Sequence, residues 1–410
     1  MPAFATLDDV DLKGRRVVLR LDLNVPLADG KVADPTRIER VVPTLREIVD
    51  KGAVAIVLAH FDRPKGKVVP SMSLKPVADT LGRAVNRPVT FVPTDWRDDA
   101  ALEAARAARP GAILLMENTR FHPGEEANDP DFARRLADLG DVYVNDAFSA
   151  AHRAHASTEG IAHLLPAYAG RAMEAELRAL EAALETPRRP LTAIVGGAKV
   201  STKLDLLANL TARVDRLVIG GAMANTFLAA RGMPVGRSLS EPDLFAAALK
   251  TLAGAEGRGC EVLLPVDARI AGELRPGVAS RLVAIDAVAP DSMILDIGPR
   301  TVEIVNASLD RSATLVWNGP FGAFETPPFD EGTISVARHA ARLTRDGQLA
   351  SIAGGGDTVA ALNKAHAADD FTYVSTAGGA FLEWLEGKTL PGIKVLQSGR
   401  QDQRTNRGNP

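Results

Sequence analysis

Apolar strands alternate with amphipathic helices along most of the chain, and this alternation limits the possible folds more than any other feature. Runs such as Val17–Val25 and Ala53–His60 are largely apolar, and so are the later runs SMILDIG and TLVWNGP. Strands that are apolar on both faces need helices on both sides, as strands of parallel sheets do. The pattern predicts an α/β protein with mainly parallel sheets and helices on both faces.

The helix expected after the first strand shows both of its ends in the sequence. Asp34-Pro35 is typical of an N-cap residue followed by proline at the first helical position. Apolar residues then recur at helical spacing from Ile38 to Val49. Gly52 is typical of a helix end, so we expect the helix to stop there.

A change of pattern near residues 170–190 divides the chain into two domains. The 410 residues suffice for roughly two to three domains of ordinary size. Residues 173–184 carry an apolar stripe on a helix rich in Glu and Ala, and two prolines follow before residue 191. We place a first domain at residues 1–172, a connecting helix and hinge at 173–190, and a second domain at 191–387. The polar residues 397–410 lack periodicity and are expected to be disordered.

Composition excludes several classes of protein. Lys and Arg number 48 and Asp and Glu 51, a formal net charge of −3, so we expect no nucleic-acid partner. Cys260 is the only cysteine, which excludes an internal disulfide and a cysteine-rich zinc site. No run approaches the roughly 18 apolar residues of a membrane span, and the N-terminus lacks a secretion signal. We expect a cytoplasmic protein without a membrane partner.

Four strands of the second half run directly into glycines and then into a helix. They are IVGGAKVSTK, VIGGAMANTF, SIAGGGDTVAA and STAGGAFLEW. Glycine lets the backbone approach a ligand closely, and the free N–H groups of a helix start attract anions. Taken singly, each turn is explained by the need for glycine in a tight turn. Four turns at the carboxyl ends of strands together favour a site for nucleotide phosphates.

Neither common phosphate motif accompanies these turns, because the chain has no G-x-x-x-x-G-K-[ST] and no G-x-G-x-x-G after a strand. Asp357, after three glycines, is placed to hold Mg²⁺ on phosphate oxygens, and it could equally cap the following helix. Lys199 and Lys203 lie four residues apart, so we expect them to share a helix face beside the phosphates.

Charged side chains take the place of glycines at the strand ends of the first half. Single arginines there are usually solvated, but several at equivalent strand ends converge on one mouth and suit the binding of phosphate and carboxylate. A histidine metal site is disfavoured because no H-E-x-x-H pattern is present. The residues are Asp22, Asn24, Arg37, His60, Asp62, Arg63, Arg120, His152, Arg153 and His155.

Ten segments, in order from about residue 7 to residue 396, resemble the 3-phosphoglycerate kinase family. Among them are RLDLNVPL, AHFDRPKG, MENTRFHPGEE, YVNDAFSAAHRAHAST, VWNGPFGAFE and AGGGDTVAA. The resemblance implies two Rossmann-like domains joined by a connecting helix. The first would bind 3-phosphoglycerate or 1,3-bisphosphoglycerate and be completed by residues 388–410, and the second would bind Mg-ADP or Mg-ATP.

The resemblance also implies a role for individual positions. Glu325 would hold the nucleotide ribose, Asp357 would be the Mg²⁺ ligand, and Arg37, Lys203 and Gly356 would be catalytic. The implied substrate-binding residues are Asp22, Asn24, Arg37, His60, Arg63, Arg120 and Arg153. The implied nucleotide-binding residues are Lys199, Lys203, Gly298, Glu325, Gly355, Gly356, Asp357 and Thr358.

Some positions depart from the family pattern without removing a charged ligand-binding group. Asp62, Ser149 and Ala377 stand where the pattern has glycine, and Leu23 stands where it has phenylalanine. Arg171-Ala172 replaces the apolar pair that usually precedes the connecting helix. Asp62 adds a negative charge beside the expected anion site.

The reaction implied is reversible, Mg²⁺-dependent phosphoryl transfer between 1,3-bisphosphoglycerate and ADP, a step of glycolysis and gluconeogenesis. The attacking oxygen is anionic in both directions, so the reaction needs positioning and charge neutralisation rather than a general base. We expect a monomer whose domains close about hinges at Gly170–Arg171 and Thr186–Pro190, with Gly170 taking more of the rotation because prolines restrict the second segment. The alternatives are a non-catalytic nucleotide sensor or scaffold, which would be expected to lack Arg37, Lys203 or Asp357, and a nucleotide-dependent dehydrogenase, which the absent dinucleotide motif disfavours.

Overall fold

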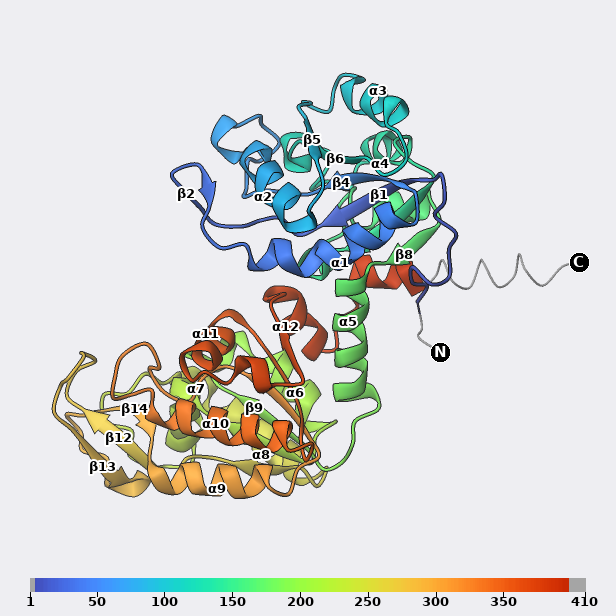
Figure 1. Ribbon diagram of the computed structural model, residues 1–410. Helices are drawn as coiled ribbons and strands as arrows, with labels where there is room; N and C mark the ends of the chain where they lie inside the picture. Colours follow the sequence, from blue (N-terminus) through green and yellow to red (C-terminus); the bar gives the residue numbers. More distant parts are fainter. Residues whose placement is uncertain (1–3, 398–410) are drawn as a thin grey trace, which may run out of the picture. The chain divides into compact units, whose positions relative to one another are not determined.

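The computed structural model describes residues 4–397, which form two compact units (Figure 1). The first unit contains the described residues up to Arg178 and those from Thr389 on, and the second is Ala179–Lys388. Each unit is built on a six-stranded sheet, so the predicted α/β class with two mainly parallel sheets is confirmed. The functional domain boundaries remain a prediction, and residues 398–410 of the polar tail lie outside the described residues.

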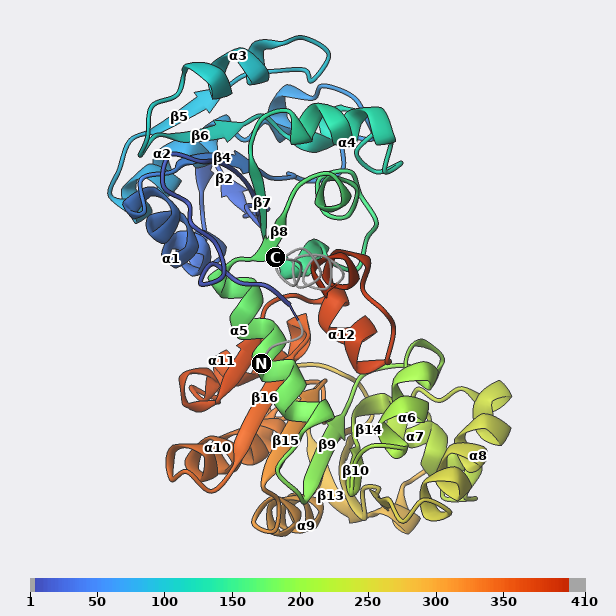
Figure 2. The same cartoon turned by 90° about the vertical axis from the view of Figure 1, so that its right-hand side faces the viewer.

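The first unit has six parallel strands in the order β5-β6-β4-β1-β7-β8. Helices cover the sheet on both sides, with α1 and α2 on one side and α4 on the other (Figure 2). The strands are β1 Arg16–Leu21, β4 Val54–Leu58, β5 Val89–Val92, β6 Ile113–Met116, β7 Val142–Asp146 and β8 Ala167–Ala169, with a small hairpin of β2 Leu27–Ala28 and β3 Lys31–Val32. The helices are α1 Thr36–Asp50, α2 Lys75–Val85, α3 Ala100–Ala107 and α4 Pro130–Ala137.

Helix α1 begins and ends for local reasons. The Asp34 carboxylate accepts a hydrogen bond from the backbone N–H of Thr36 at 2.9 Å, and the helix begins at Thr36, so Pro35 is the N-cap residue and not the first helical residue. At the other end Gly52 adopts a φ of 79°, and the N–H of Ala53 donates to the carbonyl of Ile48 at 3.3 Å. This left-handed glycine closes the helix, as predicted.

The second unit also has six parallel strands, in the order β11-β10-β9-β15-β16-β17. Strands β10 and β11 lie on one side of β9, and β15, β16 and β17 lie on the other, so the strand order reverses between β9 and β15. Open α/β sheets bind ligands at such a position. The strands are β9 Leu191–Val195, β10 Arg216–Ile219, β11 Glu261–Leu263, β15 Thr314–Asn318, β16 Ala350–Gly354 and β17 Tyr373–Ser375. The helices are α6 Leu204–Thr211, α7 Gly221–Ala230, α8 Phe245–Glu256, α9 Pro299–Leu309, α10 Glu331–Arg345, α11 Gly356–Lys364 and α12 Gly379–Leu385.

A separate antiparallel sheet of three strands, in the order β13-β12-β14, departs from the predicted alternation. The run SMILDIG, expected to continue the main sheet, forms β14 (Met293–Ile297) and pairs with β12 (Asp267–Ala271). Strand β13 (Ser280–Ala284) was not predicted, because its side chains are largely exposed and form no apolar run. The small hydrophobic core of this antiparallel sheet consists of Ala268, Ile270 and Val288.

The connecting helix α5 spans Arg171–Leu180 and continues as a π-helical turn at Glu181–Glu185. Its first turn is firmly held, because the Arg171 guanidinium contacts the carboxylates of Asp8, Glu47 and Glu174 at 2.6, 2.7 and 2.8 Å.

Gly170, which precedes α5, is equally confined. A Cβ at this position would lie 2.4 Å from the buried carboxyl of Asp146, which accepts the N–H of Met173 at 2.9 Å. These contacts disfavour Gly170 as the main point of rotation, and the expected hinge motion stays a prediction. Within residues 4–397, no helix is long and apolar enough to cross a membrane.

The second sheet depends on a close backbone approach at Gly196, which yields a prediction. A Cβ there would lie 2.0 Å from the carbonyl oxygen of Pro320, so Gly196→Ala should lower the free energy of unfolding by about 2 kcal/mol. Gly272, with no heavy atom within 4 Å, provides the control, and Gly272→Ala should change stability by less than about 0.5 kcal/mol. Urea unfolding midpoints measure both effects. Equal midpoints for the two variants would contradict the assignment.

Candidate active site

The residues predicted to bind the acid substrate lie at the carboxyl edge of the first sheet. Strands β6, β4, β1 and β7 are neighbours, so the loops that follow them meet at one edge. Arg37 joins this edge from the first turn of α1. The loops supply Arg120 after β6, His60 and Arg63 after β4, Asp22 and Asn24 after β1, and Arg153 after β7.

Hydrogen bonds link these loops to one another. Arg37 Nη1 forms an ion pair with Asp22 at 3.0 Å and donates to the carbonyl of Asn24 at 3.1 Å. Asn24 Oδ1 accepts the backbone N–H of Asp62 at 3.0 Å, and the carbonyl of Asp62 accepts from Arg120 Nη1 at 2.8 Å. The structure therefore brings together the residues after three adjacent strands.

The backbone conformation at residue 62 explains why aspartate is tolerated where the family pattern has glycine. Its φ of 52° lies in the left-handed region that glycine adopts most easily, and aspartate tolerates this region better than most residues. The side chain of Asp62 is exposed. The added charge at this departure from the family pattern thus lies in solvent contact.

Arg20 is a buried residue that contacts the site residue His60, and it was not among the residues predicted from the sequence. It is 1% exposed, and its Nη2 contacts Nδ1 of His60 at 2.9 Å. A guanidinium can only donate, so Nδ1 accepts and Nε2 of His60 carries the ring proton. Burial, together with the charges of Arg20 and Arg120, holds the pKa of His60 well below its ordinary value. The only available signal was a single arginine in an otherwise apolar strand.

Positive charge is crowded at this edge. Burial, together with nearby Arg153 and Arg20 and against the attraction of Glu126, lowers the pKa of Arg120 to about 10. An arginine still keeps its charge at neutral pH, and the ion pair of Arg120 with Glu126 at 3.3 Å offsets its burial beside other cations only in part, so a bound anion would be favourable here. The first unit therefore presents a site suited to a phosphorylated acid.

Glycine turns meet at the carboxyl edge of the second sheet. The carbonyl of Gly197, after β9, accepts the N–H of Met223 in α7 at 2.9 Å. Asn318, at the end of β15, donates from Nδ2 to the carbonyl of Gly354 at 2.8 Å. A cavity of about 440 Å³ opens there. Its lining includes Gly197, Gly221, Leu295, Phe324, Glu325 and Asp357. The turn at Ala377 is not part of this lining.

The two lysines do not share a helix face, so that prediction is wrong. A short 3-10 turn, Val200–Thr202, separates them, and Lys203 is the N-cap residue of α6. Lys199 is exposed. Lys203 Nζ instead points to the end of β9 and β15, where it donates to the carbonyl of Gly196 and to Oδ1 of Asn318, both at 2.6 Å. Burial lowers the pKa of Lys203 to about 8.

Asp357 is not a helix cap, so that alternative is also wrong. Helix α11 begins at Gly356, after Gly355 with its φ of 98°, and Asp357 is the second helical residue. Its exposed carboxylate lines the cavity. Thr358 turns inward, and its Oγ1 accepts the N–H of Gly319 at 2.7 Å.

A magnesium ion fits Asp357 only if phosphates supply most of its ligands. Among residues 4–397 there is no group of three or more His, Cys, Asp or Glu side chains that could hold a metal ion. Magnesium typically takes one or two carboxylates and completes its shell with water and phosphate oxygens. A single free carboxylate at a phosphate turn matches that preference.

Glu325 and Gly298 have different surroundings. Glu325 lines the cavity beside Phe324, whose carbonyl accepts Lys364 Nζ at 2.7 Å. Gly298 is outside this lining and is the N-cap residue of α9. A Cβ on Gly298 would lie 2.2 Å from Asp267, whose carboxylate accepts backbone N–H groups of α9. The structure therefore gives Gly298 a packing role, and its predicted nucleotide contact remains a prediction.

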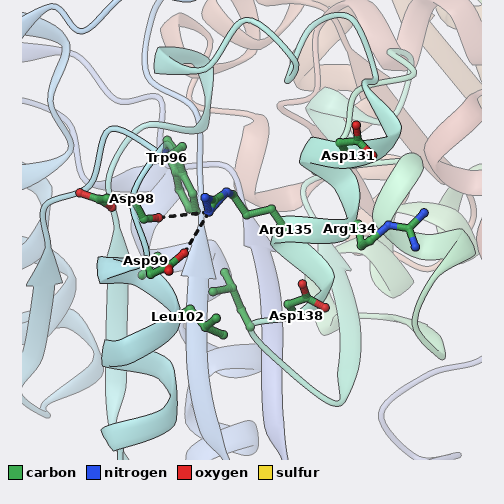
Figure 3. A pocket seen from close by; sticks show the side chains of 10 residues that line it. Trp96, Asp98, Asp99, Leu102, Asp131, Arg134, Arg135 and Asp138 are labelled. Atoms are coloured by element: carbon green, nitrogen blue, oxygen red, sulfur yellow. Dashed lines mark hydrogen bonds and ion pairs between the residues drawn. The ribbon is translucent and has the colours of Figure 1, made fainter.

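A second cavity, of about 230 Å³, lies between α3 and α4 of the first unit (Figure 3). Arg135 crosses it and is held by the carbonyl of Asp98 at 3.2 Å and the carboxylate of Asp99 at 3.3 Å. None of the predicted site residues lines this cavity. It is thus separate from the strand-end site.

Comparisons with known proteins agree over the length of the chain. The family model described as phosphoglycerate kinase matches residues 7–388. A phosphoglycerate kinase of Methylobacterium radiotolerans is 61% identical over 97% of this chain and 100% of its own, and one of Bradyrhizobium diazoefficiens is 59% identical over 96% and 98%. The solved phosphoglycerate kinase of Coxiella burnetii is 42% identical, with a TM-score of 0.90 over 96% of this chain and 99% of its own. That of Pyrococcus horikoshii is 28% identical, with a TM-score of 0.80 over 97% and 99%.

The environment of Lys203 yields a pH prediction. If nucleotide phosphates bind at this turn, as the sequence predicts, they favour the charged ammonium, so above the pKa of about 8 the lysine must take up a proton on binding. The Kd for Mg-ADP should therefore rise roughly tenfold between pH 7 and pH 9 in calorimetric titrations. In Lys203→Arg the charge persists, and the Kd should be nearly constant over this range. A pH-independent Kd for the unchanged protein would contradict this view of Lys203.

Proposed function

Because the chain belongs to the phosphoglycerate kinase family, we propose that its two sets of strand-end residues bind the two substrates of one phosphoryl transfer. The enzyme is a phosphotransferase of glycolysis that moves a phosphoryl group between 1,3-bisphosphoglycerate and ADP, forming 3-phosphoglycerate and ATP. The acid substrate belongs at the arginine-rich edge of the first unit. The nucleotide belongs at the glycine-rich edge of the second.

The observation that carries this assignment is the crowding of cations at the strand-end edge of the first unit, where the ion pair of Arg120 with Glu126 at 3.3 Å offsets it only in part. Buried Arg20 and Arg120 lie near Arg153 and a neutral His60, which suits a ligand with phosphate and carboxylate groups. The described residues that line the cavity of the second unit include no lysine or arginine and are largely apolar, with the backbone N–H groups at the start of α11 beside them. That combination suits a base and sugar followed by phosphates.

Individual roles in the second unit follow from position. Glu325 lies in the cavity wall, where its carboxylate can accept ribose hydroxyls. Gly355 and Gly356 leave backbone N–H groups open at the start of α11, where the phosphates belong. Lys203, now bonded to Asn318, would exchange that partner for a phosphate oxygen.

The mechanism needs no general base, because the attacking oxygen is a phosphate or carboxylate anion. Charge on the transferring group must be neutralised, and we assign this to Arg37 and Lys203, with Gly356 contributing its backbone N–H. Each bond that the described residues give Arg37 to Asp22 and Asn24 uses Nη1, which leaves Nη2 for a ligand. The site must also exclude water, which would hydrolyse the acyl phosphate.

Magnesium would be held by Asp357 together with the nucleotide phosphates, and it would supply charge neutralisation on their oxygens. We further propose a monomer in the cytoplasm. The buried state of Cys260, the only cysteine of the sequence, is in keeping with a reducing compartment.

A coupled assay tests the proposed activity. The purified chain should consume ATP only when both 3-phosphoglycerate and Mg²⁺ are present, since the carboxylate acceptor and the phosphate charge are both required. Omitting either component is the control. Tight nucleotide binding without any consumption would favour a sensor or scaffold instead.

Two variants separate the substrate sites. Arg37→Ala should lower kcat by about 10³-fold and leave the Kd for Mg-ADP unchanged, because a transition-state arginine is lost from the acid-substrate edge.

Asp357→Asn should raise the Kd for Mg-ADP about tenfold and leave the Kd for 3-phosphoglycerate unchanged. Calorimetry with each ligand alone, plus steady-state kinetics, provides the readout. If either variant weakened both ligands equally, the division of roles would be rejected.

A further inference from the structure

Ser149 lies beside Asp22 because of how two strands pair. Strand β7 pairs with β1 in parallel, with Leu21 opposite Asp146, so the residues after each strand are neighbours. Ser149 is in the 3-10 turn Phe148–Ala150 that follows β7. Its Oγ donates to Oδ2 of Asp22 at 2.6 Å, across the position where the strand order of this sheet reverses.

The two oxygens of Asp22 are occupied to different degrees. Oδ2 accepts two short hydrogen bonds, from Ser149 at 2.6 Å and from Arg37 at 3.0 Å. Oδ1 has only longer contacts, 3.2 Å from the N–H of Asn24 and 3.3 Å from Arg37. The Asp22 side chain is 14% exposed, so it remains partly accessible. Oδ1 is the oxygen better able to accept a further donor.

The proposed substrate has one group that can donate a hydrogen bond to a carboxylate. Phosphoglycerate carries a phosphate, a carboxylate and a hydroxyl on C2, and at neutral pH the hydroxyl is its strongest donor. Asp22 is the only carboxylate among the seven residues proposed to bind it. A carboxylate facing an anionic ligand is unfavourable unless it receives a hydrogen bond, so the C2 hydroxyl belongs on Asp22.

We propose that Ser149 is a positioning residue that occupies Oδ2 of Asp22 and thereby directs the C2 hydroxyl of phosphoglycerate to Oδ1. The inference rests on the proposed function of the first unit. Glycine, which the family pattern has at this position, has no hydroxyl, so Oδ2 would lose its shorter hydrogen bond and keep the one from Arg37. The recognition of a hydroxylated acid would then depend on a residue that departs from the general family pattern.

A substrate analogue tests this role without relying on turnover. The ligands are 3-phosphoglycerate and 3-phosphonooxypropanoate, which differ only in the C2 hydroxyl, and their Kd values are measured by calorimetry. Ser149→Ala should raise the Kd for 3-phosphoglycerate about fivefold and leave that of the analogue unchanged, because only the former uses Asp22. Ser149→Thr keeps the hydroxyl and should restore discrimination between the two ligands.

The remaining outcomes of this experiment separate a failure of the role of Ser149 from a failure of the proposed function. Equal weakening of both ligands in Ser149→Ala, or no change in either, would overturn the positioning role. An unchanged Kd for the analogue, which binds the same unit, checks that this unit is folded in the variant. If the unchanged protein failed to bind 3-phosphoglycerate, the proposed function itself would be rejected, while binding with no effect of Ser149→Ala would reject only the role of Ser149.

Discussion

Parallel strand pairing is the constraint on which the rest of this structure depends. In a parallel sheet all carboxyl ends lie at one edge, so residues far apart in sequence become neighbours once the register is set. The pairing of β1 with both β4 and β7 places Asp22 between the loop of His60 and the turn of Ser149. The pairing of β9 with β15 does the same for Gly196 and Asn318. Both candidate sites lie where the strand order reverses.

The two candidate sites are suited to anions by different physical means. The first offers side chains, with buried arginines that stay charged beside a histidine that stays neutral. The second uses backbone groups, and glycine is required because the turns nearly touch, as at Gly196 against Pro320. Side chains can discriminate a small acid by the geometry of its hydroxyl and carboxylate. Backbone N–H groups suit phosphates, which present several equivalent oxygens.

Much of the fold and the site was accessible to sequence reasoning, and the exceptions have physical causes. The apolar runs predicted both sheets because a strand buried on two faces leaves a strong signal. Strand β13 left none, because its side chains are exposed. The spacing of Lys199 and Lys203 predicted a shared helix face, but a 3-10 turn replaced the first helical turn. Arg20 was missed because its role depends on His60, forty residues away.

The sequence alone determined the fold class, the family and the residue types of both sites, since these follow from local apolar patterning and from motifs. Tertiary structure alone decided which atoms are free to act. The pairing of Asp22 with Ser149 and Arg37, the bond of Lys203 to Asn318 and the proton on Nε2 of His60 all come from contacts between distant segments. Periodicity reports which face of an element is buried. It carries no information on the partner that a polar atom meets after the strands have paired.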